Sequence, residues 1–258
     1  MSPPPSPPVV ATIAGTDSGG AAGIAADLTT FAAHGVHGAC VVAAVTAQDT
    51  LGVRAVHPVP LEVVAAQLDA VLEDLDPPVI KTGMLGSAAA VRLVARRCAD
   101  RILVVDPVLV ATSGAVLATD EVIAAYRSDL LPAATIATPN PEEYDALAPW
   151  PDIAIVRTGG GDADLLHRPD GPDRPPLAIR YPRVATDNDH GTGCTYSAAL
   201  AAHLAHGAEL ESAADAAARF VRERLTDGAA WSLGRGRGPV AHTFPATQSS
   251  PTPEGEAR

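Results

Sequence analysis

Lysine, cysteine and aromatic residues are scarce in this chain of 258 residues. Aromatic residues make up 3% of it, Lys81 is the only lysine, and the only cysteines are Cys40, Cys98 and Cys194. No two cysteines have C-x-x-C spacing, so neither a zinc finger nor a disulfide framework is indicated. Because there is only one lysine, the groups that hold a bound phosphate have to be arginine side chains, backbone amides or a metal ion.

Basic charge and long hydrophobic runs are also lacking. The formal net charge of −12 argues against a nucleic-acid-binding surface, which requires clustered Lys and Arg. No apolar run approaches the roughly 20 residues of a membrane span, and no charged-then-apolar leader is seen. We therefore predict a cytoplasmic protein that binds neither nucleic acid nor membranes.

Apolar runs typical of buried strands alternate with helical periodicity along nearly the whole chain. This alternation predicts an α/β fold with a doubly wound, mostly parallel sheet and helices on both faces. We expect a single domain over 9–244, between a disordered Pro-rich tail (1–8) and a disordered polar tail (245–258). The expected strands are 9–14, 39–45, 53–59, 79–81, 102–105, 135–137, 153–157 and 177–180. The expected helices are 23–33, 60–75, 87–98, 120–131, 141–147, 195–205 and 209–225.

A glycine-containing loop precedes the first of the two C-terminal helices, with the sequence His190-Gly191-Thr192-Gly193-Cys194-Thr195. The glycines permit a tight turn and a close approach to a ligand. The helix start directs unpaired N–H groups at the loop, which favours binding of a phosphate or of a phosphoryl group in transfer. A thiol at such a helix start loses its proton more readily than elsewhere. The alternative is a helix start with a buried cysteine and no ligand.

Several residues suited to binding a ligand directly follow predicted strands. In doubly wound sheets, ligands bind beyond the carboxyl ends of the strands. We therefore expect one binding site that includes Asp17, Gln48, Met84, Asp106 and Asn140.

Short motifs occur in a characteristic order between residues 9 and 244. They are Ile13-Ala-Gly-Thr-Asp-Ser-Gly-Gly, Ala26-Asp27-Leu28, Thr46-Ala-Gln48, His57-Pro-Val-Pro, Lys81-Thr-Gly-Met-Leu, Asp106-Pro-Val, Thr138-Pro-Asn140 with Glu143, and His190-Gly-Thr-Gly-Cys-Thr. These motifs resemble those of the hydroxymethylpyrimidine/phosphomethylpyrimidine kinases of thiamine biosynthesis, members of the ribokinase-like superfamily. The resemblance implies a ribokinase-like fold and transfer of phosphate from ATP, with Mg²⁺, to an aminopyrimidine carrying a CH₂OH group or to its monophosphate.

The resemblance also implies a pyrimidine pocket lined by Gly15, Asp17, Asp27, Gln48, Met84 and Val108. In this interpretation Asp27 holds the hydroxymethyl or amino group, and Gln48 offers a donor and an acceptor to the ring. Structural alternatives remain open for three of these residues. Asp17 can cap its own turn, Asp27 can be a solvated residue of a first helical turn, and Met84 can fill the core.

Cys194 matches the catalytic cysteine of the family. The resemblance implies that its thiolate accepts the hydroxyl proton while the amides of Gly191, Thr192, Gly193 and Cys194 stabilise the phosphoryl oxygens.

The remaining implied site residues face the metal and the nucleotide. Asp106 and Glu143 are implied to hold Mg²⁺, and Asn140, Arg157, Thr158 and His190 to lie on the nucleotide side. Helix capping is the alternative for Asn140 and Glu143, because Asn140-Pro141 resembles an N-cap followed by Pro at N1.

The chain departs from the family pattern at two places near the nucleotide. Thr112 stands where the family usually has a lysine, and only 147–152 remain where it has a helix after Glu143. Without that helix, we expect an exposed apolar patch at the strand 153–156, covered by a second subunit of a homodimer or by the C-terminal tail. We also expect ATP to bind more weakly than the pyrimidine.

Two alternatives to this function remain open at this point. One is a kinase of another hydroxymethyl-bearing ring, such as pyridoxal or a specialised pathway's pyrimidine. The other is a non-catalytic relative that binds a pyrimidine.

Overall fold

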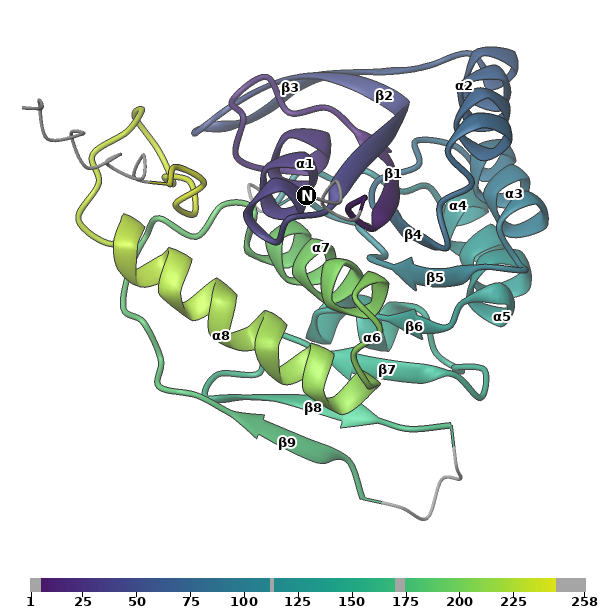
Figure 1. The fold of residues 1–258 in the computed structure, drawn as a ribbon. Coiled ribbons are helices and arrows are strands. Elements are labelled where there is room, and N and C mark those ends of the chain that lie inside the picture. Colours follow the sequence, from purple (N-terminus) through teal and green to yellow (C-terminus); the bar gives the residue numbers. More distant parts are fainter. Residues whose placement is uncertain (1–5, 112–113, 170–174, 245–258) are drawn as a thin grey trace, which may run out of the picture.

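A nine-stranded sheet in the order β3-β2-β1-β4-β5-β6-β7-β8-β9 forms the centre of the molecule (Figure 1). The computed structural model describes residues 6–111, 114–169 and 175–244. The strands from β2 to β7 in this order are parallel, and β3, β8 and β9 pair antiparallel at the two edges. The strands are β1 (Val9–Gly15), β2 (His37–Asp49), β3 (Gly52–Pro58), β4 (Val79–Thr82), β5 (Ile102–Val105), β6 (Ile136–Ala137), β7 (Ala154–Arg157), β8 (Ala163–His167) and β9 (Leu177–Arg180). The predicted doubly wound α/β fold is confirmed.

Helices cover both faces of the sheet (Figure 1). One face is covered by α1 (Gly23–Ala33), α7 (Thr192–Ala205) and α8 (Leu210–Gly228). The other face is covered by α2 (Leu61–Asp74), α3 (Ala88–Arg97), α4 (Asp120–Ala125), the π-helical turn η1 (Tyr126–Leu130), α5 (Leu131–Ala133) and α6 (Pro141–Ala146).

Each parallel strand supplies side chains to two hydrophobic clusters. In β1, Val10 packs with the α1–α7–α8 layer, whereas Ala11 and Ile13 pack with the opposite layer. All three are 0% exposed. Burial on both faces explains why the strand sequences are continuous apolar runs without alternation.

The structure contains one strand that was not predicted, and two predicted elements have clearly different bounds. The strand β8 was missed because Ala163–His167 lies in a polar Gly/Asp/Pro-rich stretch and pairs at an edge. The strand β2 continues to Asp49, beyond its apolar run, because its last residues pair with β3 in a hairpin. Helix α7 begins at Thr192 and not at Thr195, since Gly191 already provides the turn into the helix.

The predicted tails lie largely outside the described residues. These exclude 1–5 of the N-terminal tail, all of 245–258, and Thr112. Within 6–8, the carbonyl of Pro8 accepts a hydrogen bond from the His37 amide, which ties this end to the sheet. Among the described residues, no helix is long and apolar enough to cross a membrane.

The apolar patch expected on the strand 153–156 is absent, and that expectation was wrong. Ala154, Ile155 and Val156 are 3%, 5% and 0% exposed. Ile155 is the register partner of His167 in β8, so the two side chains share a face. The Tyr144 ring stacks on His167 with centroids 5.9 Å apart and on Trp150 at 5.4 Å. These rings pack beside β8, and the strand is already buried, so this face needs no second subunit to bury it.

Candidate active site

A cavity of about 720 Å³ opens at the carboxyl ends of the parallel strands. Fourteen of the sixteen predicted site residues line it, so the strand ends meet around one cavity, and the roles of these residues stay predictions. They are Gly15, Asp17, Gln48, Met84, Asp106, Val108, Asn140, Glu143, Thr158, His190, Gly191, Thr192, Gly193 and Cys194. The two predicted residues that do not line it are Asp27 and Arg157.

The loop before α7 depends on glycine at position 191. Gly191 has φ of +90°, and a Cβ there would lie 1.8 Å from the carbonyl oxygen of Ala21. No other residue fits this turn without moving the backbone. Gly193 and Cys194 follow in the first turn, where N–H groups lack partners within the helix, and both line the cavity. The loop is therefore shaped to bind an anion.

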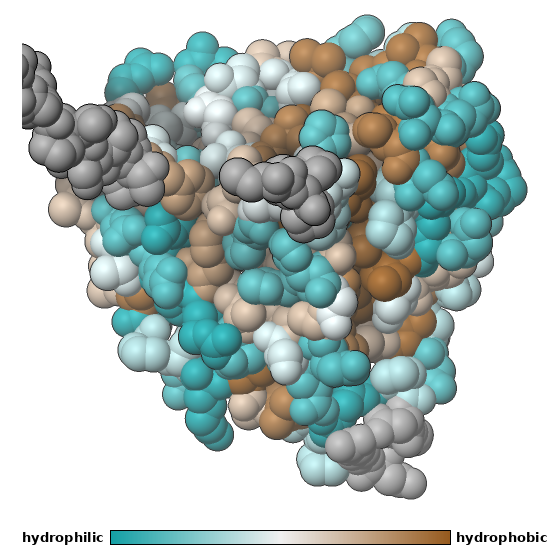
Figure 2. Space-filling view, in the orientation of Figure 1, coloured by the Kyte–Doolittle hydropathy of each residue, from teal (hydrophilic) through white to brown (hydrophobic). Residues whose placement is uncertain are grey.

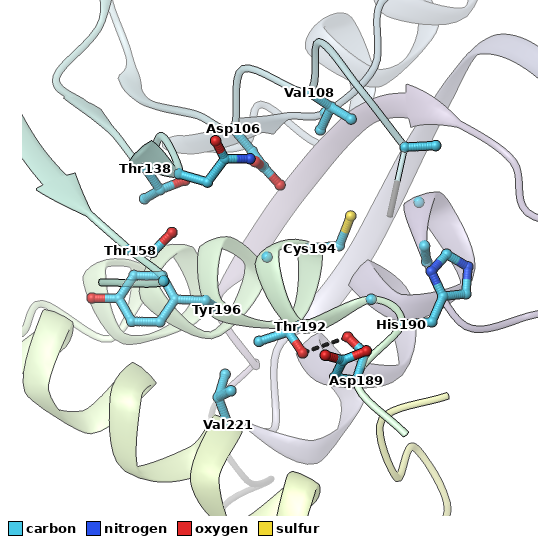
Figure 3. Close-up of a pocket in the computed structure, with 18 of the residues that line it drawn as sticks. Asp106, Val108, Thr138, Thr158, Asp189, His190, Thr192, Cys194, Tyr196 and Val221 are labelled. Atoms are coloured by element: carbon cyan, nitrogen blue, oxygen red, sulfur yellow. Dashed lines mark hydrogen bonds between the residues drawn. The ribbon is translucent and has the colours of Figure 1, made fainter. Parts of the chain in front are cut away.

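Cys194 projects from the first turn of α7 into the cavity, with Asp106 on one side and His190 on the other (Figure 3). Burial raises the pKa of its thiol to about 12, although the charge of Lys81 acts in the opposite direction. The expectation of a lowered pKa was therefore wrong for the free protein. Burial of the sulfur outweighs the helix start and the nearby cation, so Cys194 is a thiol at neutral pH.

The prediction that Asp27 contacts the substrate is wrong. Asp27 and Lys81 both have side chains that are 0% exposed, and Lys81 Nζ lies 2.9 and 3.0 Å from the two oxygens of Asp27. Thr12 Oγ1 donates to Asp27 Oδ2 at 2.6 Å. The carboxylate is fully used in balancing a buried cation, which also lies 3.6 Å from Asp106 Oδ2.

Asp106 and Glu143 form an acidic wall of the cavity. Burial raises the pKa of Asp106, opposed mainly by Lys81, and Ser197 Oγ donates to its Oδ2 at 3.0 Å. Burial and the Asp106 charge together raise the pKa of Glu143 to about 8. Two buried carboxylates with an incompletely balanced charge fit a hard divalent cation such as Mg²⁺, which prefers oxygen ligands.

Asn140 caps the N-terminus of α6, which confirms the capping alternative, and it also lines the cavity. Its Oδ1 accepts from the Glu143 amide at 2.9 Å, while Glu143 Oε2 accepts from the Asn140 amide at 2.9 Å. Glu143 Oε1 accepts from the Leu109 amide at 3.3 Å. This capping box fixes the direction of the Glu143 side chain, so capping and a place in the site are compatible.

Asp17 closes its own turn, as the structural alternative proposed. Its oxygens accept from the amides of Gly19, Ala21 and Ala22 at 2.8–3.0 Å. His190 Nε2 lies 3.2 Å from Asp17 Oδ2 and 2.8 Å from the Gln48 side-chain amide. His190 therefore contacts two residues of the predicted pyrimidine pocket, and its assignment to the nucleotide side stays a prediction. The sequence separation of 142 residues between Gln48 and His190 hid this contact.

Arg157 points away from the cavity. Its guanidinium lies 5.3 Å from the centroid of the Tyr144 ring, on the side where the helix is missing. Sequence reasoning also missed cavity residues, among them Asp164, Tyr196 and Arg222. None of them belongs to a motif with an evident chemical role, and Asp164 lies on the unpredicted strand β8.

Comparisons with known proteins agree on the kind of protein. Residues 17–159 and 161–241 match the profile of a family described as phosphomethylpyrimidine kinase. A hydroxymethylpyrimidine/phosphomethylpyrimidine kinase of Synechococcus elongatus is 41% identical over 261 residues, which cover 92% of this chain and 98% of that protein. One from Rhizobium meliloti is 42% identical, covering 91% and 96%.

Solved structures of two kinds of kinase share the fold of this chain. A Bacillus subtilis pyridoxal kinase in complex with ADP has a TM-score of 0.80 at 28% identity, covering 92% of this chain and 98% of that one. A phosphomethylpyrimidine kinase from Clostridium difficile has a TM-score of 0.68 at 30% identity, covering 84% and 98%. Together with the cavity and its glycine loop, these matches show that the chain belongs to the phosphomethylpyrimidine kinase family.

Proposed function

We propose that the protein transfers the terminal phosphate of ATP to 4-amino-5-hydroxymethyl-2-methylpyrimidine, to its monophosphate, or to both. The observation that carries this proposal is the position of Cys194. It lies in one cavity between the anion-binding loop, the acidic pair Asp106 and Glu143, and the ring-sized end near Gln48 and Met84. Named relatives at about 40% identity support the same substrate class.

The residues of this chain support phosphoryl transfer in three ways. The amides of Gly191, Gly193 and Cys194 stabilise charge on the transferred group, and their fixed orientation costs no reorganisation during the reaction, whereas the Thr192 amide donates to the Asp189 carbonyl. Asp106 and Glu143 would hold Mg²⁺, which neutralises phosphate charge when bound. Asn140 keeps Glu143 directed at the cavity through the capping box.

Cys194 is placed to accept the proton of the attacking hydroxyl group. Because its thiol is protonated in the free protein, its own proton has to leave first. That proton passes to solvent, and the positive charge of Lys81 favours the thiolate that remains.

One assay tests the proposal and its alternatives. ADP release is measured with Mg·ATP and, separately, the aminopyrimidine alcohol, its monophosphate, and pyridoxal. Turnover of either pyrimidine supports the proposal. A higher kcat/KM for pyridoxal than for either pyrimidine would instead identify a pyridoxal kinase. The similarity to solved pyridoxal kinases is the observation that favours this second candidate. Pyrimidine binding by calorimetry without ADP release would identify a non-catalytic relative.

The homodimer stays a prediction, on a different surface from the one first expected. The β2–β3 hairpin exposes Val45, Leu51 and Val56, which are 49%, 55% and 40% accessible. On the face drawn in Figure 2, the hydrophobic band right of centre lies below the position of β2 and β3 in Figure 1 and is not part of this hairpin surface. Light scattering coupled to size exclusion gives the mass directly. A mass of one chain at micromolar concentration would exclude the dimer.

A further inference from the structure

His190 stands between an ionised carboxylate and the side-chain amide of Gln48. Its Nε2 lies 3.2 Å from Asp17 Oδ2 and 2.8 Å from Nε2 of the Gln48 amide. All three residues line the cavity. The protonation of this single nitrogen therefore decides which end of the Gln48 amide can face it.

Asp17 fixes that protonation. Its Oδ2 also accepts from the amides of Ala21 and Ala22 at 3.0 and 2.9 Å, as only an oxygen lone pair can. Burial by itself raises the pKa of Asp17, but hydrogen bonds from His190 and from the amides of Gly19 and Ala22 outweigh burial and hold the pKa below its usual value. An imidazole lone pair facing this carboxylate would be repelled, so Nε2 carries a hydrogen and donates it to Asp17. The same holds whether the ring is neutral or doubly protonated.

A nitrogen that carries a hydrogen cannot accept one from the Gln48 NH₂ group. The two ends of a glutamine amide have nearly the same shape and are assigned from their hydrogen-bond partners. In the structure the Gln48 nitrogen occupies the position 2.8 Å from His190 Nε2. Exchanging the two ends of the amide puts the oxygen at this position, where it shares the Nε2 hydrogen with Asp17. The NH₂ group then occupies the other position of the amide, where no described residue bonds to it.

We propose that the Asp17–His190 pair orients the Gln48 amide with its NH₂ group toward the cavity, so that the substrate ring must present a hydrogen-bond acceptor at that point. Asp17 and His190 are positioning residues, and Gln48 determines specificity. The acceptor is an aromatic ring nitrogen if the substrate is the pyrimidine of the proposed function, on which this inference rests for the identity of the ring. A ring N–H or an amino group at the same point would face a second donor and bind poorly.

For Gln48→Glu, the proposal and its alternative predict opposite changes in affinity for the substrate. Glutamate has the same shape but can only accept when ionised, so at pH 8 it should weaken binding of the aminopyrimidine alcohol at least about 10-fold in calorimetry. If the oxygen of Gln48 faced the substrate instead, the same change would keep or strengthen binding, and that result would overturn the proposal. Gln48→Met is the matched control, which fills the same space without hydrogen bonds and should show a similar loss. Unchanged ATP affinity excludes damage to the fold.

Substrate analogues test the positioning role of His190. Two monodeaza analogues, each with one ring nitrogen replaced by CH, are compared with the parent pyrimidine. The wild type should bind one of them at least about 10-fold more weakly, and His190→Phe should reduce this discrimination by releasing the Gln48 amide. A role of His190 in stability alone would weaken all three ligands equally, which would contradict the proposal.

A ligand-free measurement separates this inference from the proposed function. In ¹⁵N-histidine-labelled protein, NMR should show a hydrogen on Nε2 of His190. A hydrogen on Nδ1 alone would refute the orientation, even if the pyrimidine binds and is phosphorylated. If the wild type does not bind the pyrimidine, the proposed function fails, while the NMR result still decides the orientation of Gln48.

Discussion

Replacing Glu143 by glutamine should stabilise the metal-free protein at alkaline pH. Glu143 is 6% exposed, and burial together with the charge of Asp106 raises its pKa from 4.5 to about 8. Between these pH values the folded protein holds a proton that the unfolded chain releases. The free energy of unfolding therefore falls as pH rises from about 4.5 to about 8 and levels off above that.

The size of this effect follows from the shift in pKa. At about 1.36 kcal/mol per pH unit, a shift from 4.5 to about 8 corresponds to an upper limit of about 5 kcal/mol. Glutamine stays neutral at every pH, but it has one acceptor oxygen for the two amides, of Asn140 and Leu109, that Glu143 satisfies. One unsatisfied amide costs about 1–3 kcal/mol. The free energy of unfolding of the variant should thus be equal to or lower than that of the wild type near pH 5, and a few kcal/mol higher at pH 9.

Urea denaturation followed by circular dichroism, in EDTA at each pH unit from 5 to 9, measures the difference. Addition of Mg²⁺ at pH 9 should raise the stability of the wild type, since an ion bound to the folded state stabilises it by mass action, and should raise that of the variant less. A difference between variant and wild type that does not change with pH would refute the reasoning. So would a wild type that is the more stable protein at pH 9 in EDTA.

Three further changes have expected results that the structure determines. Cys194→Ala should lower kcat by about 10²–10⁴-fold with little change in pyrimidine affinity, and a near-normal kcat would exclude proton transfer through this thiol. Asp27→Ala or Lys81→Met alone should each lower the free energy of unfolding by about 3–5 kcal/mol, because one buried charge is left without its partner. The double variant Asp27→Leu/Lys81→Met should lower the free energy of unfolding much less. Equal losses in the single and double variants would show that the ion pair contributes little to stability. Gly191→Ala should abolish turnover and lower the melting temperature, because its Cβ would meet the Ala21 carbonyl at 1.8 Å; a fully active variant would mean that the loop does not need this conformation.

The sequence predicted most of the site because the fold brings distant positions together by rule. Parallel strands end at one edge of the sheet, so Gln48, Asp106 and Asn140 were expected to meet although they lie far apart in the chain. The helix after His190 was expected to present its amides there for the same reason. Periodicity and the positions of the strand ends suffice for these residues, whereas the roles of the site residues came from the resemblance to the kinase family.

The sequence could not show which charged groups pair inside the protein. Asp27 and Lys81 are 54 residues apart, and nothing in either motif indicates that α1 and β4 bring their side chains within 3 Å. A carboxylate beside a substrate-binding motif is equally consistent with contact to a ligand and with neutralising a buried lysine. The same limitation hid the His190 contact with Asp17 and Gln48. Burial of an ion pair depends on side-chain geometry, which spacing along the chain does not encode.

The shortened segment after Glu143 shows why loss of an element does not by itself predict an interface. A missing helix exposes a strand only if nothing else reaches the same face. Here the unpredicted strand β8 brings His167 beside Ile155, and Tyr144 and Trp150 stack over the gap. Trp150 Nε1 donates to the Tyr144 carbonyl at 2.9 Å, which holds the turn after α6 against the sheet. Flat rings cover more apolar area per residue than aliphatic side chains, so a few residues replace a helix. A subunit interface has to be sought where side chains such as Leu51 remain exposed in the complete fold, and not where a family element is absent.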